Sequence, residues 1–584
     1  MLKQLAKSIR EYKKPTILTL LCMVGEAVIE TIIPFITATY IINVIQRDGD
    51  RVNMGYIIGV GLILALGAIL SLSFGGLAGF TCAKAASGFA KNLRHDIFAK
   101  IQTFTFSNID KFSSTSLVTR MTTDVSNVQM SFMMLIRIAV RSPLMLIFSI
   151  VMATYMGGWL ALTFTVIIPV LGLGLFWVSR KAMPAFRRVF KKYDRLNESI
   201  EENVRGMRVV KGFSREDYEK EKFAKAADGI CDDFTHAERI VALNTPLMNF
   251  CMYFNMAFVL LVGSFLAIKY PESGVNIGQI SAMLTYGVAI LMSLMMLSMI
   301  YVMLTISAES ARRVCEVLSE EPDLKLPEHP ITEVADGSVS FENVNFKYAK
   351  NAKKNALSNI NITIHSGMTV GIIGGTGAGK SSLVQLIPRL YDTTEGCVKV
   401  GGRNVQDYDV EALRDSVAMV LQKNLLFSGT IKENLRWGNP NATDAELEEA
   451  CKLAQAHDFV QSFPEGYDTK IEQGGTNVSG GQKQRLCIAR ALLKKPKILI
   501  LDDSTSAVDT KTDALIRAGF ASFIPETTKI IIAQRIASVE HADMIIVMDN
   551  GTVTAIGKHE ELLASSEIYR DVYEQQKNGG GDNE

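Results

Sequence analysis

Six long apolar stretches occupy the first 310 residues and decide the architecture of this half of the chain. A helix needs about 20 residues to cross a lipid bilayer, and several of these stretches exceed that length. A helix of about 31 residues would be about 46 Å long, so parts of it should project into water. The sequence therefore predicts an all-α domain over residues 1–315 in a lipid bilayer, with six spans near 15–45, 54–82, 130–156, 159–179, 237–268 and 277–307.

The connections between the predicted spans alternate in length. Those after the second and fourth spans, residues 83–129 and 180–236, are long and rich in Lys and Arg, whereas the others are short and poor in basic residues. The N-terminal segment 1–14 is basic as well. Because basic connections stay on the cytoplasmic side of a membrane, we expect a multi-pass protein of the cell membrane with both termini in the cytoplasm.

The two long connections have a helical pattern. The first has an apolar residue at every fourth position, at Phe89, Leu93, Ile97 and Ile101. This spacing predicts that the spans continue as helices into the cytoplasm. Polar or glycine-marked breaks interrupt the helices at residues 113–116 and 209–214. Such breaks fit ordinary turns between helices, and equally fit helix tips that contact the second half of the chain.

Two pairs of ionisable residues lie inside predicted spans. They are Glu26 and Glu30 in the first span and Arg137 and Arg141 in the third. Each pair has i, i+4 spacing, which places both members on one helix face. Charge in hydrocarbon is costly, so such side chains face a partner or a cavity. Two interpretations stay open, an ion-pair lock between the spans and a substrate cavity.

The sixth predicted span carries a stripe of methionines. The stripe consists of Met292, Met295, Met296, Met299 and Met303. Methionine is flexible and polarisable, which suits a surface for varied apolar ligands, but the same stripe also serves plain helix packing. Met292, Met295 and Met299 are therefore candidate cavity residues beside the charged pairs.

The second half of the chain has the pattern of a water-soluble α/β domain. Charge over the 584 residues is nearly balanced, 61 basic against 60 acidic, which gives no indication of a nucleic-acid partner. The eight cysteines are scattered without a C-x-x-C pair, which fits a reducing compartment and offers no metal site. We expect an acidic, proline-containing linker over 316–337, the α/β domain over 338–575 and a disordered polar tail over 576–584.

A phosphate-binding loop lies at residues 374–381. The pattern G-x-x-x-x-G-K-[ST] follows an apolar strand and precedes a helical segment, which is the context that such a loop requires. Glycines let backbone N–H groups turn toward phosphates, and the helix N-terminus adds partial positive charge. Lys380 should reach the β/γ-phosphates, and Ser381 should help to hold Mg²⁺. The predicted nucleotide-binding residues of this segment are Gly374, Gly375, Thr376, Gly377, Ala378, Gly379, Lys380, Ser381 and Ser382.

A second motif lies between this loop and an apolar strand that ends in Asp502. It reads Val478-Ser479-Gly480-Gly481-Gln482 and resembles the LSGGQ signature of ABC transporters. Nearly the whole chain resembles an exporter-type half-transporter of that family. The resemblance implies an all-α six-helix transmembrane domain with long cytoplasmic helical extensions. It also implies a following α/β P-loop ATP-binding cassette domain with a helical subdomain.

The resemblance assigns further residues in family order. Tyr348 is similar to the aromatic residue that stacks on adenine, and Gln422 to the glutamine that meets Mg²⁺ and the attacking water while sensing the membrane domain. Asp502 resembles the Walker B aspartate of the Mg²⁺ shell. Residues 506–509, which end in Asp509, resemble the D-loop of the dimer interface. Two cassettes would enclose two ATP molecules, each between the P-loop of one chain and the signature of the other.

Two positions depart from the pattern of an active family member. Asp503 stands where the family has a glutamate that polarises the attacking water, and its carboxylate falls about 1 Å short because aspartate lacks one methylene. Gln534 stands in place of the switch histidine. It can hydrogen-bond the γ-phosphate but cannot take up a proton near neutral pH. His541, seven residues further on, does not replace it.

The two departures resemble the degenerate chain of heterodimeric bacterial multidrug ABC exporters. They predict a subunit that moves small apolar or amphipathic compounds by alternating access, with ATP and Mg²⁺ as cofactors. Its own site would hydrolyse ATP poorly, and its signature would complete the active site of a second half-transporter. A homodimer with two slow sites, a lipid flippase and an ATP-gated regulator or channel stay open as alternatives. An importer is disfavoured, because importers of this superfamily usually carry the cassette on a separate chain.

Overall fold

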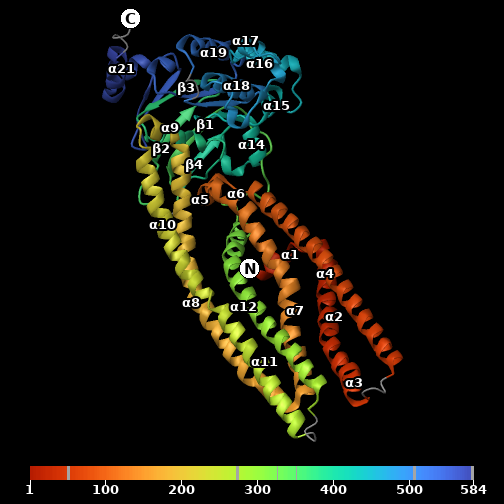
Figure 1. Ribbon diagram of the computed structural model, residues 1–584. Coiled ribbons are helices and arrows are strands. Elements are labelled where there is room, and N and C mark those ends of the chain that lie inside the picture. Colours follow the sequence, from red (N-terminus) through yellow and green to blue (C-terminus); the bar gives the residue numbers. More distant parts are fainter. Residues whose placement is uncertain (49–52, 271–274, 325, 350–351, 504–507, 580–584) are drawn as a thin grey trace. The chain divides into compact units, whose positions relative to one another are not determined.

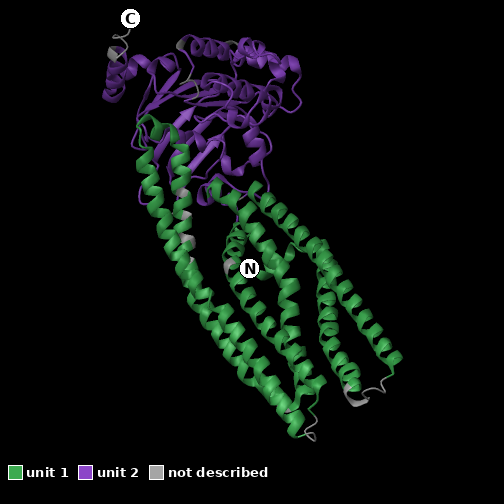
Figure 2. Ribbon diagram, viewed as in Figure 1, with its two compact units in different colours: residues 1–103, 113–320 green, residues 104–112, 321–584 purple. Residues whose placement is uncertain are grey.

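The chain divides into two compact units (Figure 2). Unit 1 comprises residues 1–103 and 113–320, and unit 2 comprises residues 104–112 and 321–584. A short segment of the first half, residues 104–112, thus belongs with the second half. The structure is a computed structural model that describes residues 1–48, 53–270, 275–324, 326–349, 352–503 and 508–579.

Unit 1 is built from long helices (Figure 1). Six helical stretches among its described residues are long and apolar enough to cross a membrane, which confirms the predicted number of spans. They are Arg10–Ile45, Met54–Gln102, Ser114–Gly157, Leu162–Phe186, Glu216–Lys269 and Ile277–Ser319. The individual helices are α1 (Leu2–Lys7), α2 (Lys13–Ile36), α3 (Asn43–Asp48), α4 (Met54–Gln102), α6 (Ser114–Thr119), α7 (Val125–Gly157), α8 (Leu162–Arg205), α9 (Met207–Gly212), α10 (Glu216–Val241), α11 (Asn244–Lys269) and α12 (Ile277–Ser319).

Several of these helices are longer than a bilayer is thick. α4 has 49 residues and α8 has 44, and 49 residues of helix measure about 74 Å against a hydrocarbon core of about 30 Å. Phe89, Leu93 and Ile97 are buried on α4. The apolar stripe that predicted a helical extension therefore packs inside unit 1, and α4 runs through it without a break.

Both predicted breaks carry a short helix or a turn. α5 (Phe106–Phe112) is followed by Ser113, which has a φ of +57° and caps α6 by accepting the Ser116 N–H at 3.3 Å. α5 is part of unit 2, so this tip packs with the second half of the chain. The second break contains α9, which belongs to unit 1.

Unit 2 contains two larger sheets. The four-stranded sheet is antiparallel, and the six-stranded sheet is parallel except for β12, which pairs antiparallel with β11. The first has the order β2 (Leu357–Ile364), β1 (Val339–Phe346), β4 (Glu395–Val400), β5 (Arg403–Asn404). The second has the order β12 (Thr552–Gly557), β11 (Met544–Asp549), β3 (Thr369–Gly374), β10 (Thr528–Ile532), β9 (Ile498–Asp502), β6 (Val417–Val420).

The parallel sheet brings the predicted site residues to one edge. β9 lies between β10 and β6, and β10 lies between β9 and β3. Because parallel strands point the same way, their carboxyl ends lie at the same edge of the sheet. The acidic pair lies at the carboxyl end of β9, and the loop after β3, Gln534 after β10 and Gln422 after β6 lie at the same edge.

Helices cover this sheet and form a helical subdomain with the small hairpin β7 (Gly429–Thr430) and β8 (Lys470–Ile471). Strand β9 shows why both faces must be covered, since Ile498 and Ile500 pack into one buried cluster and Leu499 and Leu501 into the other. The α-helices that follow β3 are α13 (Lys380–Gln385), α14 (Val410–Ser416), α15 (Ile431–Arg436), α16 (Asp444–Leu453), α17 (His457–Gln461), α18 (Gly480–Leu493), α19 (Thr510–Phe523), α20 (His559–Ser565) and α21 (Glu567–Gly579).

Two predicted boundaries were wrong. α12 extends to Ser319, into the predicted linker 316–337, and the end of that linker packs on the α/β domain, with Val334 2% exposed. Lys497 Nζ donates to the Ala335 carbonyl at 3.0 Å and holds this end in place. The predicted disordered tail begins too early, because α21 continues to Gly579; residues 580–584 lie outside the described part of the chain.

Candidate functional site: an ATP-binding edge with a shortened carboxylate

The phosphate-binding loop joins β3 to α13. Gly379 has a φ of +93°, a left-handed conformation that glycine adopts at little cost. A Cβ atom at Gly379 would lie 2.9 Å from Leu357 Cδ2, and one at Gly374 would lie 2.2 Å from the Met548 carbonyl oxygen. Side chains therefore do not fit at these two positions, and the loop backbone is free to face a phosphate chain.

Lys380 and Ser381 lie at the start of α13. Lys380 Nζ donates to the carbonyl oxygens of Gly374 and Gly375 at 2.7 and 2.8 Å, and Ser381 Oγ donates to Asp502 Oδ1 at 3.1 Å. Burial lowers the pKa of the Lys380 ammonium and raises the pKa of the Asp502 carboxyl. A hydroxyl and a carboxylate oxygen are ligands that Mg²⁺ prefers.

These contacts fit the ion that the sequence predicted. We propose that Ser381 and Asp502 hold Mg²⁺ and that Gln422 faces it, as the sequence predicted. The bound ion would neutralise charge on the ATP phosphates. Lys380, which here bonds carbonyl oxygens of its own loop, has a flexible side chain that can turn to the phosphates.

Three predicted residues meet at one carboxylate oxygen. Asp503 Oδ2 accepts a hydrogen bond from Gln534 Nε2 at 2.7 Å and another from Gln422 Nε2 at 3.3 Å. Asp503 is 9% exposed and has a φ of +49°, a conformation that aspartate tolerates. Burial raises the pKa of its carboxyl, and the two amide donors oppose that shift. Both departures from the active pattern are therefore in direct contact.

Tyr348 contacts helix α13 through its hydroxyl. Its hydroxyl is 2.7 Å from Ser382 Oγ, and a cavity of about 380 Å³ is bounded by Tyr348, residues 377–382 and Asn550. The position beside the phosphate loop fits the predicted adenine contact, which stays a proposal. Asn550 was not predicted, because it follows β11 as an ordinary turn residue with a φ of +49°.

Tyr391 is a second residue that the sequence did not predict. Its ring meets that of Tyr348 edge-on at 5.2 Å between centroids, and its hydroxyl donates to Asp110 Oδ2 of α5 at 2.6 Å. The ring of Phe106, also on α5, lies 6.0 Å away. Burial and the Asp110 carboxylate both raise the pKa of Tyr391, so it stays a neutral donor. The helix tip at α5 is thus connected to the predicted adenine contact.

The signature motif begins helix α18. Ser479 Oγ accepts the Gln482 N–H at 3.2 Å, and Gln482 Oε1 accepts the Ser479 N–H at 2.9 Å, which is a capping box. Ser479 and Gly480 are exposed, whereas Val478 is 9% exposed. Among the described residues, the Ser479 and Gln482 side chains have no hydrogen bond to the phosphate loop. The exposed helix N-terminus is suited to an anion that approaches from outside the domain.

The D-loop is described only in part. Ser506 and Ala507 lie outside the described residues. Asp509 caps α19 by accepting the Thr512 N–H at 2.9 Å, and these hydrogen bonds lower the pKa of its exposed carboxyl. The structure therefore gives Asp509 a capping role within the domain, and its predicted nucleotide contact stays a proposal.

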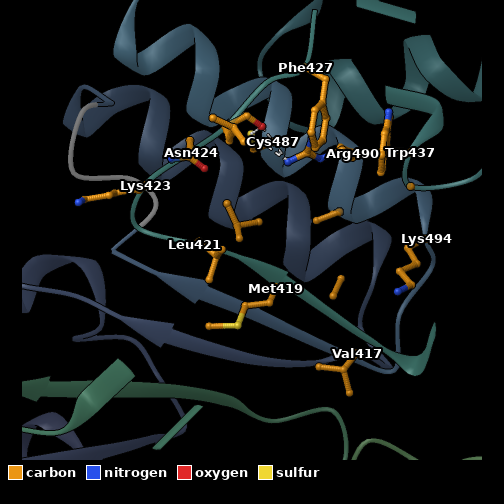
Figure 3. A pocket seen from close by; sticks show the side chains of 15 residues that line it. Val417, Met419, Leu421, Lys423, Asn424, Phe427, Trp437, Cys487, Arg490 and Lys494 are labelled. Atoms are coloured by element: carbon orange, nitrogen blue, oxygen red, sulfur yellow. Dashed lines mark hydrogen bonds between the residues drawn. The ribbon is translucent and has the colours of Figure 1, made fainter. Parts of the chain in front are cut away.

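A groove of about 320 Å³ opens between β6 and α18 (Figure 3). Phe427 and Trp437 stack along it with ring centroids 4.4 Å apart, and Trp437 is 65% exposed. Arg490 Nη2 donates to the Leu425 carbonyl at 3.3 Å on the α18 side. Leu421, the residue before Gln422, also lines the groove, so a segment that fills it would contact a direct neighbour of the glutamine that donates to Asp503.

Comparisons with known proteins decide the family. Residues 16–303 match the family described as ABC transporter transmembrane region, and residues 357–506 match the family described as ABC transporter. The uncharacterized ABC transporter ATP-binding protein YfiB of Bacillus subtilis is 36% identical over 560 residues, which cover 96% of both chains. The chain belongs to the ABC transporters.

Other similar proteins agree with this assignment. YknU of Bacillus subtilis, also described as an uncharacterized ABC transporter ATP-binding protein, is 31% identical over 97% of this chain and 95% of its own. The structure of a bacterial Atm1-family ABC exporter with ATP bound superposes with a TM-score of 0.83 over 97% of this chain and 99% of that one, at 23% identity. This ABC transporter therefore has the exporter fold, with membrane and ATPase domains in one chain.

The membrane domain of this transporter contains the predicted charged residues. Arg141 on α7 pairs with both glutamates of α2, through Nη2 to Glu30 Oε2 at 2.6 Å and through Nε to Glu26 Oε1 at 3.4 Å. Arg137 is exposed and has no ion pair among the described residues. The geometry of Arg141 therefore fits the ion-pair lock, whereas Arg137 stays a candidate for the cavity.

The methionine stripe on α12 is only partly packed. Met292 is 47% exposed and Met299 is 50% exposed, while Met295 is 36% exposed. These side chains are accessible within a single chain of the transporter. Their place in a substrate cavity stays a proposal.

Removal of the lock should destabilise the membrane domain. Arg141→Ala leaves two glutamates without their shared cation, which we expect to cost about 3 kcal/mol of unfolding free energy and to lower the melting temperature in detergent by several degrees. Arg137→Ala, the same change one turn earlier, is the matched control and should leave the melting temperature unchanged. An equal fall in both variants would show that the ion pairs contribute nothing.

Proposed function

We propose that this chain is one subunit of a heterodimeric ABC exporter in the cell membrane, with both termini in the cytoplasm. It would move small apolar or amphipathic compounds outward by alternating access. ATP bound between two cassettes closes them and opens the cavity outward, and hydrolysis at the partner's site resets the transporter. The observation that carries this proposal is the contact of Asp503 with Gln534 beside an intact phosphate loop.

The geometry at Asp503 explains why this site would retain ATP. A general base must reach the attacking water with an available lone pair, but Asp503 is one methylene short and its Oδ2 already accepts two amide N–H groups. Gln534 can donate to a γ-phosphate but cannot carry a proton for it. The Ser381–Asp502 contact and Lys380 are independent of these changes, so binding would survive where cleavage is slow.

The signature would serve the partner. Ser479 and Gly480 are exposed at the N-terminus of α18, where the helix dipole favours an anion. The ATP held there would belong to the P-loop of the second half-transporter. Intact residues at this motif, beside altered residues at the hydrolytic positions, support a division of labour between two different chains.

The groove between β6 and α18, which Leu421 helps to line, would sense the membrane domain. Its exposed apolar rings, Phe427 and Trp437, suit a helix tip from a membrane domain as the occupant. Movement of that tip would shift Gln422 and, through it, Asp503.

The partly exposed Met292 and Met299 support varied apolar substrates, since methionine adapts to ligands of different shape.

Restoration of both hydrolytic residues tests this function. Asp503→Glu together with Gln534→His should speed cleavage of ATP on this chain by about 100-fold, because a placed general base contributes at least that much. The measurement photolabels the purified transporter with γ-³²P azido-ATP and follows the loss of γ-phosphate from this chain alone. Gln534→Asn is the control that changes the same position without adding a titratable group.

The same experiment separates the alternatives. A wild-type chain that loses its γ-phosphate as fast as the restored chain would contradict the slow site and would favour a homodimer. Substrate flux in vesicles that persists when all ATP cleavage is blocked would favour an ATP-gated channel. Flux of fluorescent lipid alone would favour a flippase.

A further inference from the structure

The last helix of the described chain is α21 (Figure 1, dark blue), and one of its faces packs against the ATPase domain. Tyr569 on this face is fully buried, and its hydroxyl lies 2.8 Å from His559 Nδ1. Val572 and Tyr573 pack against the same buried cluster. Gln576 follows at i+3 from Tyr573 and i+7 from Tyr569, so it lies on the anchored face. The anchored helix therefore holds Gln576 against the domain.

Both ends of the Gln576 carboxamide bond the loop after β10. Gln576 Oε1 accepts the Ile536 N–H at 2.8 Å, and Gln576 Nε2 donates to the Gln534 carbonyl at 2.7 Å. On the other side of Gln534, the Ala533 N–H donates to the Ile372 carbonyl of β3 at 3.2 Å. The backbone of Gln534 is thus held before and after the residue.

The side chain of Gln534 extends from this clamped backbone to Asp503 Oδ2, 2.7 Å away. A shift of the backbone by a few tenths of an ångström would lengthen that contact, and hydrogen bonds weaken with distance and angle. A movement of Gln576 would therefore also move the Gln534 carboxamide, which faces the nucleotide site.

We propose that Gln576 is a positioning residue of the ATP site. It keeps the Gln534 carboxamide where it can donate to the γ-phosphate of bound ATP, so that docking of α21 slows the release of nucleotide from this chain. Helix α21 then fixes the position of the loop that carries Gln534. This inference rests on the proposed ATP site of this chain and does not depend on the heterodimer.

The test measures release of radiolabelled AMP-PNP, which is not cleaved, from the purified full-length transporter. The release phase that belongs to this chain is the one lost in Lys380→Ala. Gln576→Ala should speed that phase about fivefold to tenfold, as expected for the loss of two hydrogen bonds.

Gln576→Glu keeps the acceptor for the Ile536 N–H but places a carboxylate against the Gln534 carbonyl, so release from this variant should be at least as fast as from Gln576→Ala. Gln575→Ala, one residue earlier on an exposed face, should match the wild type.

A double variant separates positioning from general stability. If Gln576 acts through Gln534, Gln576→Ala should add nothing in a Gln534→Ala background, and exchange of the Ile536 amide hydrogen should be faster than in the wild type. Release within twofold of the wild type in Gln576→Ala, or effects of the two changes that multiply, would overturn the proposal. Failure of the heterodimer would appear instead as rapid ATP cleavage on this chain, which AMP-PNP does not report.

Discussion

Gly480→Glu should abolish ATP turnover by the assembled transporter, with a fall of about 1000-fold. Gly480 is the exposed first residue of α18, where the helix N-terminus favours an anion. Under the proposed function, a carboxylate there would repel the phosphates of an ATP held by the partner chain, and two charges about 4 Å apart interact with about 4 kcal/mol in a partly screened site. Steady-state ATPase activity in liposomes measures the effect.

The control for this prediction adds the same charge elsewhere. Ala445→Glu places a carboxylate in the first turn of α16, at an exposed position of the same subdomain. Its ATPase activity should equal that of the wild type. Full activity of Gly480→Glu would mean that the signature of this chain faces no hydrolysed nucleotide, which would contradict its role for the partner.

Lys380→Ala should weaken ATP binding by this chain between about 10-fold and 100-fold, because the ammonium is the charged donor nearest the loop and such hydrogen bonds contribute about 1.5–3 kcal/mol. Turnover of the whole transporter should fall by less than about tenfold, since under the proposed function a different partner chain supplies the hydrolytic P-loop with its own lysine. Equilibrium binding of ATP and steady-state ATPase activity are measured on the same preparation.

Lys354→Ala is the matched control, because Lys354 lines the same cavity as Lys380 but lies outside the phosphate loop. It should change ATP affinity much less. Complete loss of turnover in Lys380→Ala would indicate that the site of this chain is itself a hydrolytic site. If this chain mainly completes the partner's active site, Gly480→Glu must reduce ATP turnover severely and Lys380→Ala only mildly.

Motifs formed by consecutive residues were predictable from sequence because their geometry is local. The glycines at 374 and 379 are needed by the loop itself, and the capping box of Ser479 and Gln482 spans four residues. The cluster at Asp503 was predicted as a set of separate residues. The parallel order of β6, β9 and β10 brings Gln422 and Gln534 onto one oxygen.

Contacts between distant residues without a motif were not predictable. Tyr391 and Asp110 are 281 positions apart and meet only because α5 packs in unit 2. Gln576 lies in a polar segment that reads as disordered, and its order comes from backbone groups of the loop after β10. The linker was misjudged for a similar reason, since Val334 gains its burial from the α/β domain rather than from its neighbours in the chain.

The fate of ATP on each chain of the native complex tests the central proposal most directly. The transporter is purified through a tag on this chain, allowed one turnover with azido-ATP in the presence of vanadate, and photolabelled. The proposal predicts a second, different half-transporter in equal amount, with intact ATP on this chain and trapped ADP on the partner. Two identical chains that carry trapped ADP in equal amounts would contradict it.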